Sequence, residues 1–484
     1  MSSEEEPASP TARVMQSRGF NFCIVTIMGF TTPIDVDVFK KGIEQTMAKH
    51  PRFFCALVAK DKTSGDMSWK RTDVDIDNHV FAPDLDPNME NPDKFVEDFA
   101  SDFLASPMDM TKPLWEVYIL NVKTVYANST AIFKIHHSLG DGLSLISLFM
   151  ACAKKTSNPE SVHVKPLRKQ KPISNHGFMK RIFLFLWTMV LIGFNTLIGC
   201  ALFVASLLFF KDSETPIKGS RGIEISPKRF VHKAINLDDV KLVKNALNVS
   251  MNDVLLGATE AALSRYLNRR YEKLREKGTE IMNKTNFLPR NLRFRSAIMF
   301  SLKPHMTAEE LIEVLEKRKD LNGKWGNLFG FVIIPFTIAL EDDPLVRIYR
   351  AKANMDKKKY SLEAKFPFKF VTLLLKLFGL EVAGEAMRRA FDSCTVSFSN
   401  VTGPREAYSF FGHDICYLVP SLHGAAQSLF IHCQSYGNKL VFMLAADEKK
   451  VPDPHELCDD FVTSFESIKE AVINRGLVKH SKLS

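Results

Sequence analysis

The sequence predicts an α/β protein of two domains with an apolar insert between them. Short apolar runs with strand character alternate with segments of helical spacing, which is typical of mixed sheets flanked by helices. The chain has 484 residues, which is too long for one hydrophobic core and suggests two domains of roughly 200 residues each. The run Ile182–Phe210 contains no charged residue, which sets it apart from both halves.

The first half alternates strands and helices. Strands are expected over Phe20–Gly29, Phe53–Val58, Trp69–Arg71, Pro113–Leu120 and Thr130–Ile135, and helices over Asp35–His50, Pro92–Phe103 and Leu143–Ala153. Asp35 is a candidate N-cap, and Pro51 ends the helix that it begins. Residues 1–12 are expected to be disordered, and the acidic, polar start has no apolar core of a signal peptide.

The segment His136–Gly142 lies between an apolar strand and an apolar helix, with a glycine-rich turn in the middle. Side chains alternate between the two faces of a strand. His137 therefore shares a face with Phe133 and Ile135, and His136 points the other way. The two imidazoles are badly placed to bind one metal ion together.

An imidazole titrates near neutral pH, so His137 can accept a proton from a hydroxyl and return it elsewhere. Asp141 either orients this imidazole or anchors the turn. Gly142 leaves room for a bulky ligand. The competing interpretation is a strand that ends in two hydrogen-bonded histidines.

The insert begins after a polar, basic linker, Lys154–Lys180. As one helix, Ile182–Phe210 would be about 43 Å long at ~1.5 Å per residue, whereas a hydrocarbon core is only ~30 Å thick. The segment is apolar nearly all round, which favours membrane association over a buried soluble helix.

A single crossing would place the two halves on opposite sides of the bilayer, where they could not share a site. Basic residues flank the segment on both sides, which favours both ends in the cytosol. Gly193, Asn195 and Gly199 would permit a bend. We therefore predict a re-entrant hairpin or an in-plane segment on the endoplasmic reticulum.

The α/β pattern resumes after the insert. Strands are expected over Arg229–Asn236, Phe329–Leu340, Thr395–Ser399, Leu429–Gln434 and Lys439–Ala446, and helices over Leu237–Ala246, Val254–Tyr271, Thr307–Arg318, Asp343–Lys359, Phe366–Leu380 and Pro454–Arg475. Ser250 or Asn252 caps the second of these helices. Phe366–Leu380 is either a core helix or a helix that rests on a lipid surface.

The composition excludes several classes. Lys and Arg number 64 against 55 Asp and Glu, a formal charge of +9, yet no nucleic-acid module is visible. An anionic ligand or membrane surface explains the surplus, as does an ordinary solvated surface. The eight cysteines form no Cys-x2-Cys pair, which suggests neither a zinc site nor a disulfide framework and fits reduced thiols in the cytosol.

Four motifs together resemble the wax ester synthase/diacylglycerol acyltransferase family, its plant members in particular. They are His136–Gly142, Pro113-Leu114-Trp115, Asn252-Asp253-Val254-Leu255-Leu256-Gly257 and Ser399-Asn400-Val401-Thr402-Gly403-Pro404. The first alone also occurs in chloramphenicol acetyltransferases and peptide-synthetase condensation domains. Thr402 departs from the proline expected in many relatives and leaves the following turn intact.

The resemblance implies a two-domain, chloramphenicol-acetyltransferase-like fold, with the site in a channel between domains at 13–160 and 223–484. Residues 161–222 would form the linker and the membrane segment. It implies transfer of a long-chain acyl group from acyl-CoA to a fatty alcohol, and in some members to diacylglycerol. No bound cofactor, metal or nucleic acid is expected. Location would be the endoplasmic reticulum membrane, with the plasma membrane as an alternative, and both catalytic halves cytosolic.

The resemblance also assigns roles. His137 would be the general base, with His136 structural or a minor helper and Asp141 stabilising the loop. Gly142, Asn252, Asn400, Pro113 and Trp115 would line the substrate channel. Asn252 would donate to the oxyanion, and an N-cap is its alternative role; a core role is the alternative for Pro113 and Trp115. A non-catalytic lipid-binding scaffold and an acyltransferase for another alcohol are the competing functions.

Overall fold

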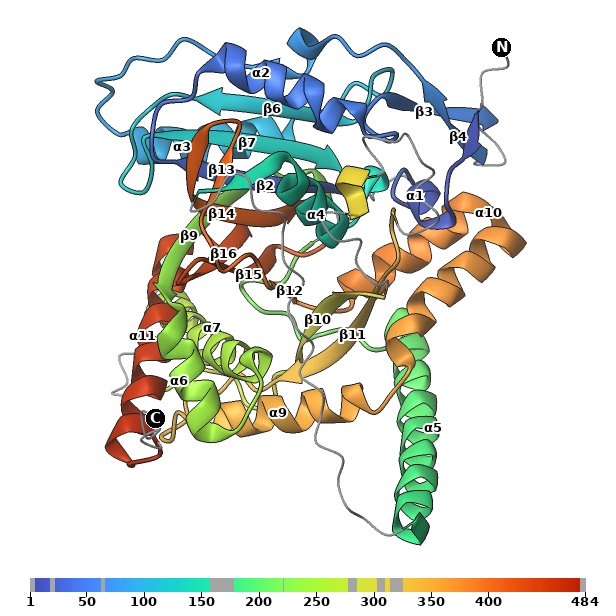
Figure 1. Cartoon of the computed structure of the whole chain (residues 1–484). Coiled ribbons are helices and arrows are strands. Elements are labelled where there is room, and N and C mark those ends of the chain that lie inside the picture. Colours follow the sequence, from blue (N-terminus) through green and yellow to red (C-terminus); the bar gives the residue numbers. More distant parts are fainter. Residues whose placement is uncertain are drawn as a thin grey trace.

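The computed structural model describes residues 5–17, 22–61, 66–156, 178–220, 222–276, 285–302, 310–313 and 325–478. Over these ranges the strands form three sheets, two large and one small, with helices against them (Figure 1). The α/β class predicted from the sequence is confirmed.

The first large sheet has seven strands in the order β5-β6-β7-β2-β14-β13-β8. They are β2 (Cys23–Phe30), β5 (Val80–Phe81), β6 (Trp115–Leu120), β7 (Ser129–His136), β8 (Ala153–Lys155), β13 (Tyr408–Phe410) and β14 (His413–His423), with helices α2 (Val36–Gln45), α3 (Pro92–Ala105) and α4 (Gly142–Cys152). Asp35 caps α2 by accepting from the backbone N–H groups of Asp37 and Val38, as its sequence position predicts.

The second large sheet has six strands in the order β11-β10-β12-β15-β16-β9. They are β9 (Lys228–Asn236), β10 (Phe294–Ser301), β11 (Phe329–Phe336), β12 (Val396–Val401), β15 (Leu429–Tyr436) and β16 (Lys439–Asp447), with helices α6 (Leu237–Leu247), α7 (Met251–Glu276), α9 (Val346–Lys359) and α11 (Pro454–Asn474). Ser250 caps α7: its hydroxyl accepts from the N–H of Asp253, whose carboxylate accepts from the N–H of Ser250. The expected helix Thr307–Arg318 lies mostly outside the described residues.

Two strands cross from the second half of the sequence into the first sheet. The expected second domain, 223–484, includes β13 and β14, yet β14 pairs antiparallel with β2 and β13 pairs with β8. The sequence did not predict β14, and an apolar run that indicates a strand carries no information about a partner nearly 400 residues away. The first sheet is therefore built from both ends of the chain, and a contiguous boundary does not describe it.

The N-terminal segment is more ordered than the sequence suggests. Disorder was expected over residues 1–12, but β1 (Glu6–Pro7) pairs with β4 (Asp66–Arg71), which also pairs with β3 (Cys55–Asp61). Helix α1 (Pro10–Val14) follows, capped by Ser9, with Ala12 and Val14 buried. Long-range pairing and burial therefore order residues 5–12 despite their polar composition.

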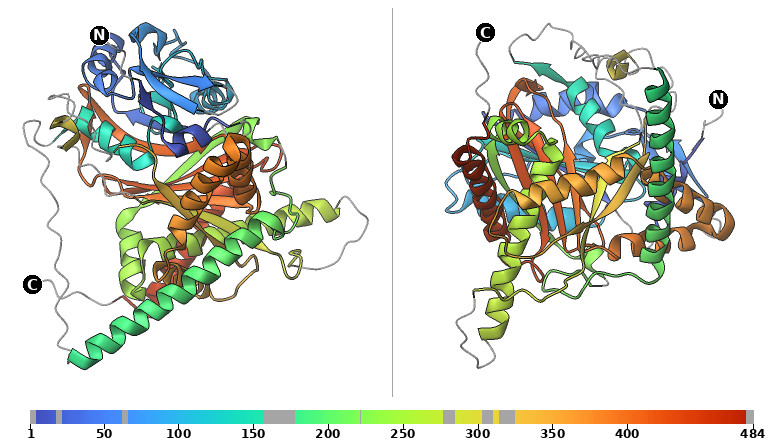
Figure 2. Two further views of the ribbon diagram at one scale, coloured as in Figure 1. Left: turned by 90° about the vertical axis from the view of Figure 1, so that its right-hand side faces the viewer. Right: turned by 90° about the horizontal axis from the view of Figure 1, so that it is seen from below.

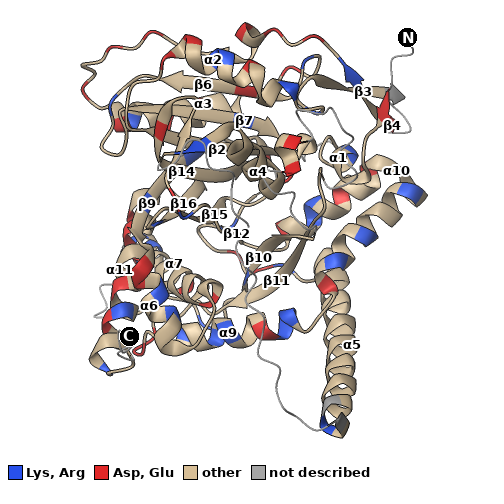
Figure 3. Cartoon of the chain, viewed as in Figure 1, with Lys and Arg blue, Asp and Glu red and all other residues tan. Residues whose placement is uncertain are grey.

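The insert forms one long helix, α5 (Phe178–Leu208), which runs along the outside of the molecule (Figures 1 and 2). Within it, Ile182–Leu208 is long and apolar enough to cross a membrane, and most of it is exposed. Charged residues are absent from most of its length and frequent on the neighbouring helices (Figure 3). The hairpin alternative is wrong, because the helix continues through Gly193, Asn195 and Gly199 without a break.

Helix α10 (Phe366–Asp392) lies on the same side of the molecule as α5 and kinks at Gly379, whose φ is 80°. Val371 and Leu375 of its first part are buried in the core, whereas Leu377 and Phe378 are exposed. This segment is thus a core helix on one face and an exposed apolar surface on the other.

A buried carboxylate fastens the end of α5 to the second sheet. Asp212 accepts from the backbone N–H and the Nε of Arg295 at 2.7 and 2.6 Å, and from the N–H and hydroxyl of Thr395 at 2.8 and 2.6 Å. The Arg295 guanidinium also donates to the hydroxyl of Ser206 and the carbonyl of Phe210, at 2.7 and 2.8 Å. The last turns of α5 are therefore held rigidly against the body of the protein.

Asp212→Ala is expected to lower the free energy of unfolding by about 3–5 kcal/mol, because it leaves the largely buried Arg295 guanidinium without its counter-charge and two N–H groups without their acceptor. A shift of the urea midpoint measures this. Lys211→Ala is the matched control: its side chain is 71% exposed, with Nζ 3.4 Å from a carboxylate oxygen of Asp392, and an exposed pair contributes about 1 kcal/mol at most. Equal midpoint shifts in the two variants would contradict the anchoring role of Asp212.

Candidate functional site

A cavity of about 490 Å³ is lined by strands of both large sheets. His137 and Gly142 reach it from the first half, and Asn252 and Asn400 from the second. Most of the remaining lining is apolar, including Phe149 and other phenylalanines of β10, β11, β12 and β15. The two halves thus build one cavity, with the histidine segment at its wall.

The backbone explains why His137 can face this cavity. Strand β7 ends at His136, and residues 137–139 form a short 3-10 turn before α4 begins. Asp141 caps α4: its carboxylate accepts from the N–H of Ser144 at 2.9 Å. Among the described residues, apart from the two chain neighbours and the helix's own backbone, no heavy atom lies within 4 Å of where a Cβ on Gly142 would stand, so this position opens onto space.

His137 is held by Asn327, a residue of the second half. Its Nδ1 lies 2.8 Å from Asn327 Oδ1, and Asn327 Nδ2 donates to the backbone carbonyls of His137 and Ser138 at 2.5 and 3.2 Å. Because these two carbonyls can only accept, the amide orientation is fixed, and Oδ1 must accept from Nδ1–H. His137 is thereby set in the tautomer whose Nε2 carries the lone pair.

The protonation state of His137 follows from burial. Burial lowers the pKa of His137 below its ordinary value, while the Asp141 charge and the bond to Asn327 oppose this shift. The imidazole is therefore neutral at pH 7 and able to accept a proton. Asp141 acts on it through charge alone among the contacts of the described residues, since its carboxylate is engaged as the cap of α4.

His136 has a different environment. It is fully buried, and its Nδ1 accepts from the N–H of Ser138 at 3.2 Å and lies 2.7 Å from the Ser138 hydroxyl. Burial lowers the pKa of His136 to about 3. It does not line the cavity, and its contacts serve to shape the turn.

Asn252 and Asn400 meet at the cavity wall. Asn400 Nδ2 donates to Asn252 Oδ1 at 2.5 Å, which leaves the amide N–H groups of Asn252 for another acceptor. The capping of α7 is performed by Ser250, so Asn252 is not its N-cap. These two motif residues thus lie together with His137, as their division between the halves suggested.

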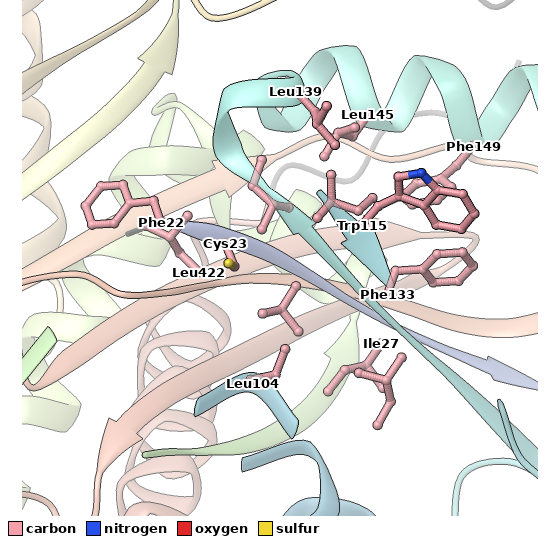
Figure 4. Packing of buried hydrophobic residues seen from close by; sticks show 14 of the residues in the cluster. Phe22, Cys23, Ile27, Leu104, Trp115, Phe133, Leu139, Leu145, Phe149 and Leu422 are labelled. Carbon is pink, nitrogen blue, oxygen red and sulfur yellow. The ribbon is translucent and has the colours of Figure 1, made fainter. Parts of the chain in front are cut away.

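Pro113 and Trp115 lie elsewhere. Neither lines the cavity. Trp115 is fully buried, stacks on His79 and donates from Nε1 to the carbonyl of Phe53 at 2.9 Å. It belongs to the cluster that also contains Phe133 and Leu139 (Figure 4). Its strand pairs with β7, so the motif supports the histidine strand from behind.

Sequence reasoning missed Asn327 and its neighbour Trp325. Trp325 Nε1 donates to the carbonyl of Leu139 at 2.7 Å, and its ring would lie 3.2 Å from a Cβ on Gly140. The two side chains therefore hold the turn at residues 137–139 from the second half of the chain. A single asparagine in Gly326-Asn327-Leu328 carries no chemical pattern of its own, and only its position in space reveals the contact.

Comparisons with known proteins agree on one family. Residues 26–255 match the model of the wax ester synthase/diacylglycerol acyltransferase catalytic domain, and residues 325–469 match the WS/DGAT C-terminal domain. The chain is 44% identical over 479 residues to wax ester synthase/diacylglycerol acyltransferase 11 of Arabidopsis thaliana, covering 98% of this chain and 96% of the relative. It is 40% identical over 483 residues to the protein numbered 4 of the same plant, covering 98% and 91%.

Two solved structures share the fold. The wax ester synthase/diacylglycerol acyltransferase from Marinobacter aquaeolei VT8 superposes with a TM-score of 0.59 at 16% identity, covering 96% of this chain and 99% of that one. The first condensation domain of the calcium-dependent antibiotic synthetase gives a TM-score of 0.56 at 11% identity, covering 97% and 96%. The expected two-domain, chloramphenicol-acetyltransferase-like fold is confirmed.

Proposed function

Because the chain belongs to the wax ester synthase/diacylglycerol acyltransferase family and is an O-acyltransferase, we propose that it acylates fatty alcohols with long-chain acyl-CoA. Wax esters are the product, and diacylglycerol is a second acceptor that would give triacylglycerol. The observation that supports this most is a neutral imidazole, oriented by Asn327, at the wall of a largely apolar cavity. Such a cavity suits an acyl chain and an alkyl alcohol.

The chemistry proceeds with His137 as general base. Nε2 takes the proton of the alcohol as its oxygen attacks the thioester carbonyl. The tetrahedral oxyanion then needs hydrogen-bond donors, and Asn252 supplies an amide N–H. When the intermediate collapses, the carbon–sulfur bond breaks, and the imidazolium returns the proton to the sulfur of CoA. A thioester is already activated, so no acyl-enzyme is required.

Purified protein with labelled acyl-CoA and a mixed panel of acceptors tests this function. We expect labelled ester with long-chain alcohols and with diacylglycerol. If ester forms only with another class of alcohol, the assignment of long-chain alcohols and diacylglycerol as acceptors is wrong. No ester with any acceptor would favour the non-catalytic lipid-binding alternative over the proposed reaction.

Membrane association is the second part of the proposal, and the geometry of α5 supports an in-plane position. Asn195 donates to the carbonyl of Tyr360 at 3.1 Å, and the Thr196 hydroxyl accepts from the N–H of Leu362 at 2.9 Å. From there to its end, one face of the helix is fastened to the body. Residues 178–194 are only about 25 Å long at ~1.5 Å per residue, shorter than a hydrocarbon core of ~30 Å.

The connection before α5 supports the same conclusion. Strand β8 lies in the first sheet and ends at Lys155, and residues 156–177 lead from it to the start of α5. This connection contains Lys165, Arg168, Lys169 and Lys171, which are costly inside lipid. Both ends of α5 therefore stay on the side of the catalytic body. We place that body in the cytosol at the endoplasmic reticulum, with the plasma membrane as the alternative.

Asn248 reports this topology. It is exposed and begins the sequon Asn248-Val249-Ser250, whereas the amide of Asn400, in another sequon, is bonded to Asn252. In microsomes we expect the active enzyme to carry no glycan. A copy sent into the lumen by an added signal peptide should gain glycans at its sequons, which include Asn283-Lys284-Thr285, and Asn248→Gln should lower their number by one. A glycosidase-sensitive mass shift in the untargeted active enzyme would contradict a cytosolic second half.

A further inference from the structure

Three buried polar side chains line the cavity, and among the described residues none has a hydrogen-bond partner. They are His432, through both ring nitrogens, Gln434, through both atoms of its carboxamide, and Ser421, through its hydroxyl. Their exposed fractions are 8%, 1% and 3%. Burying such a group without a partner costs on the order of 1–3 kcal/mol, and native proteins rarely leave one so.

These side chains form a polar patch in an apolar wall. His432 and Gln434 are two residues apart on β15 and so share one face of the strand. Ser421 comes from β14, in the other large sheet. Leu418, Leu422 and Phe430 line the cavity beside them. The patch is therefore contributed by both sheets and lies inside the same cavity as His137.

The patch carries no net charge. Burial lowers the pKa of His432 to about 3, so its imidazole is neutral and offers one donor and one acceptor. The described residues that line the cavity include no Lys or Arg. A phosphate or carboxylate would find no counter-charge here. The complementary group is a neutral one with a carbonyl or an N–H.

We propose that His432, Gln434 and Ser421 form a polar subsite that hydrogen-bonds a neutral carbonyl-bearing group of a substrate, an inference that rests on the proposed acyl transfer. A fatty alcohol offers nothing to such a subsite except the hydroxyl that reacts. The esters of diacylglycerol and the amides in the pantetheine arm of acyl-CoA both offer the required chemistry. With either substrate, the polar atoms of the patch would gain their hydrogen-bond partners only when the substrate binds.

Two variants of similar volume, Gln434→Met and His432→Leu, remove the polar atoms. Each is assayed with a fatty alcohol and with diacylglycerol, at varied acyl-CoA. If the subsite holds the acceptor ester, KM for diacylglycerol rises about tenfold, as the loss of one good hydrogen bond implies, and KM for the alcohol is unchanged. If it holds the pantetheine arm, KM for acyl-CoA rises about tenfold with both acceptors.

The melting temperature separates a binding role from a structural one. Removing an unpartnered buried polar group relieves its desolvation penalty, so both variants should raise the Tm of the free enzyme by about 2 °C or more. Met443→Leu is the matched control: Met443 is buried, apolar, pairs with His432 in the sheet register and does not line the cavity. Met443→Leu should leave every KM unchanged, and it should not raise the Tm as the other two variants do.

Unchanged KM values in both variants, with wild-type activity normal, would overturn the subsite and leave the acyl transfer standing. A fall in Tm for both, with unchanged KM, would show a structural role through buried water and would also overturn it. Absence of ester formation by the wild-type enzyme would remove the proposed function itself and the subsite with it.

Discussion

His137→Ala is expected to lower kcat by about 10²- to 10⁴-fold, the usual contribution of a general base, while the protein remains folded. His137 is the histidine of the motif that lines the cavity, and its Nδ1 is already engaged by Asn327. Removing it takes away the lone pair that accepts the alcohol proton. Steady-state kinetics with acyl-CoA and a long-chain alcohol, together with circular dichroism, measure the loss and the fold.

His136→Ala is the contrast. His136 is buried and bonded within the turn, so its loss should lower stability and reduce kcat less than the first variant does. Equal losses of kcat in two well-folded variants would contradict the assignment of one base.

The pH profile of the wild-type enzyme tests the same assignment of His137 as the general base. Burial lowers the pKa of His137 below its ordinary value, so the base is neutral above that pKa, and kcat/KM should fall only as the pH drops through it. The acid limb is therefore expected below pH ~6.5, the ordinary value for histidine. A limb above that value would contradict a base made neutral by burial.

Asn327→Ala is expected to lower kcat by about 10²-fold, at the low end of what a general base contributes. The base remains, but neither its tautomer nor its ring orientation is fixed any longer. Asn327 is therefore a positioning residue. Because its bond to Nδ1 raises the pKa of His137, removing the bond should also move the acid limb of kcat/KM to lower pH.

Trp325→Phe provides the control for Asn327. It removes the hydrogen bond from Nε1 to the carbonyl of Leu139 but leaves the Asn327 amide in place. Its loss of kcat should be less than about tenfold, as expected for one hydrogen bond of about 1 kcal/mol, and the acid limb should not move. If Asn327→Ala loses kcat but the acid limb of its kcat/KM profile does not move, then Asn327 only stabilises the turn and does not position the imidazole.

The local sequence determined most elements and the centre of the site. Short apolar runs marked β2, β7, β15 and β16, and Asp35 and the pair Ser250 and Asn252 marked helix starts, because such signals depend on neighbours a few residues away. The sequence also predicted different roles for the two histidines, and only His137 lines the cavity, although it lies in the turn after β7 and not in the strand. The family likeness followed from four short motifs.

Only the tertiary structure decided what depends on distant partners. Strand β14 joins β2 across almost the whole chain, and β1 is ordered by pairing with β4. Trp115 proved to be a core residue behind β7, and Asn327 proved to hydrogen-bond the imidazole of His137 from 190 positions away. Long-range pairing and amide hydrogen bonds leave no periodic trace in the sequence, because any strand or any asparagine can make them. The tertiary structure alone decides which strand pairs and which asparagine makes the hydrogen bond.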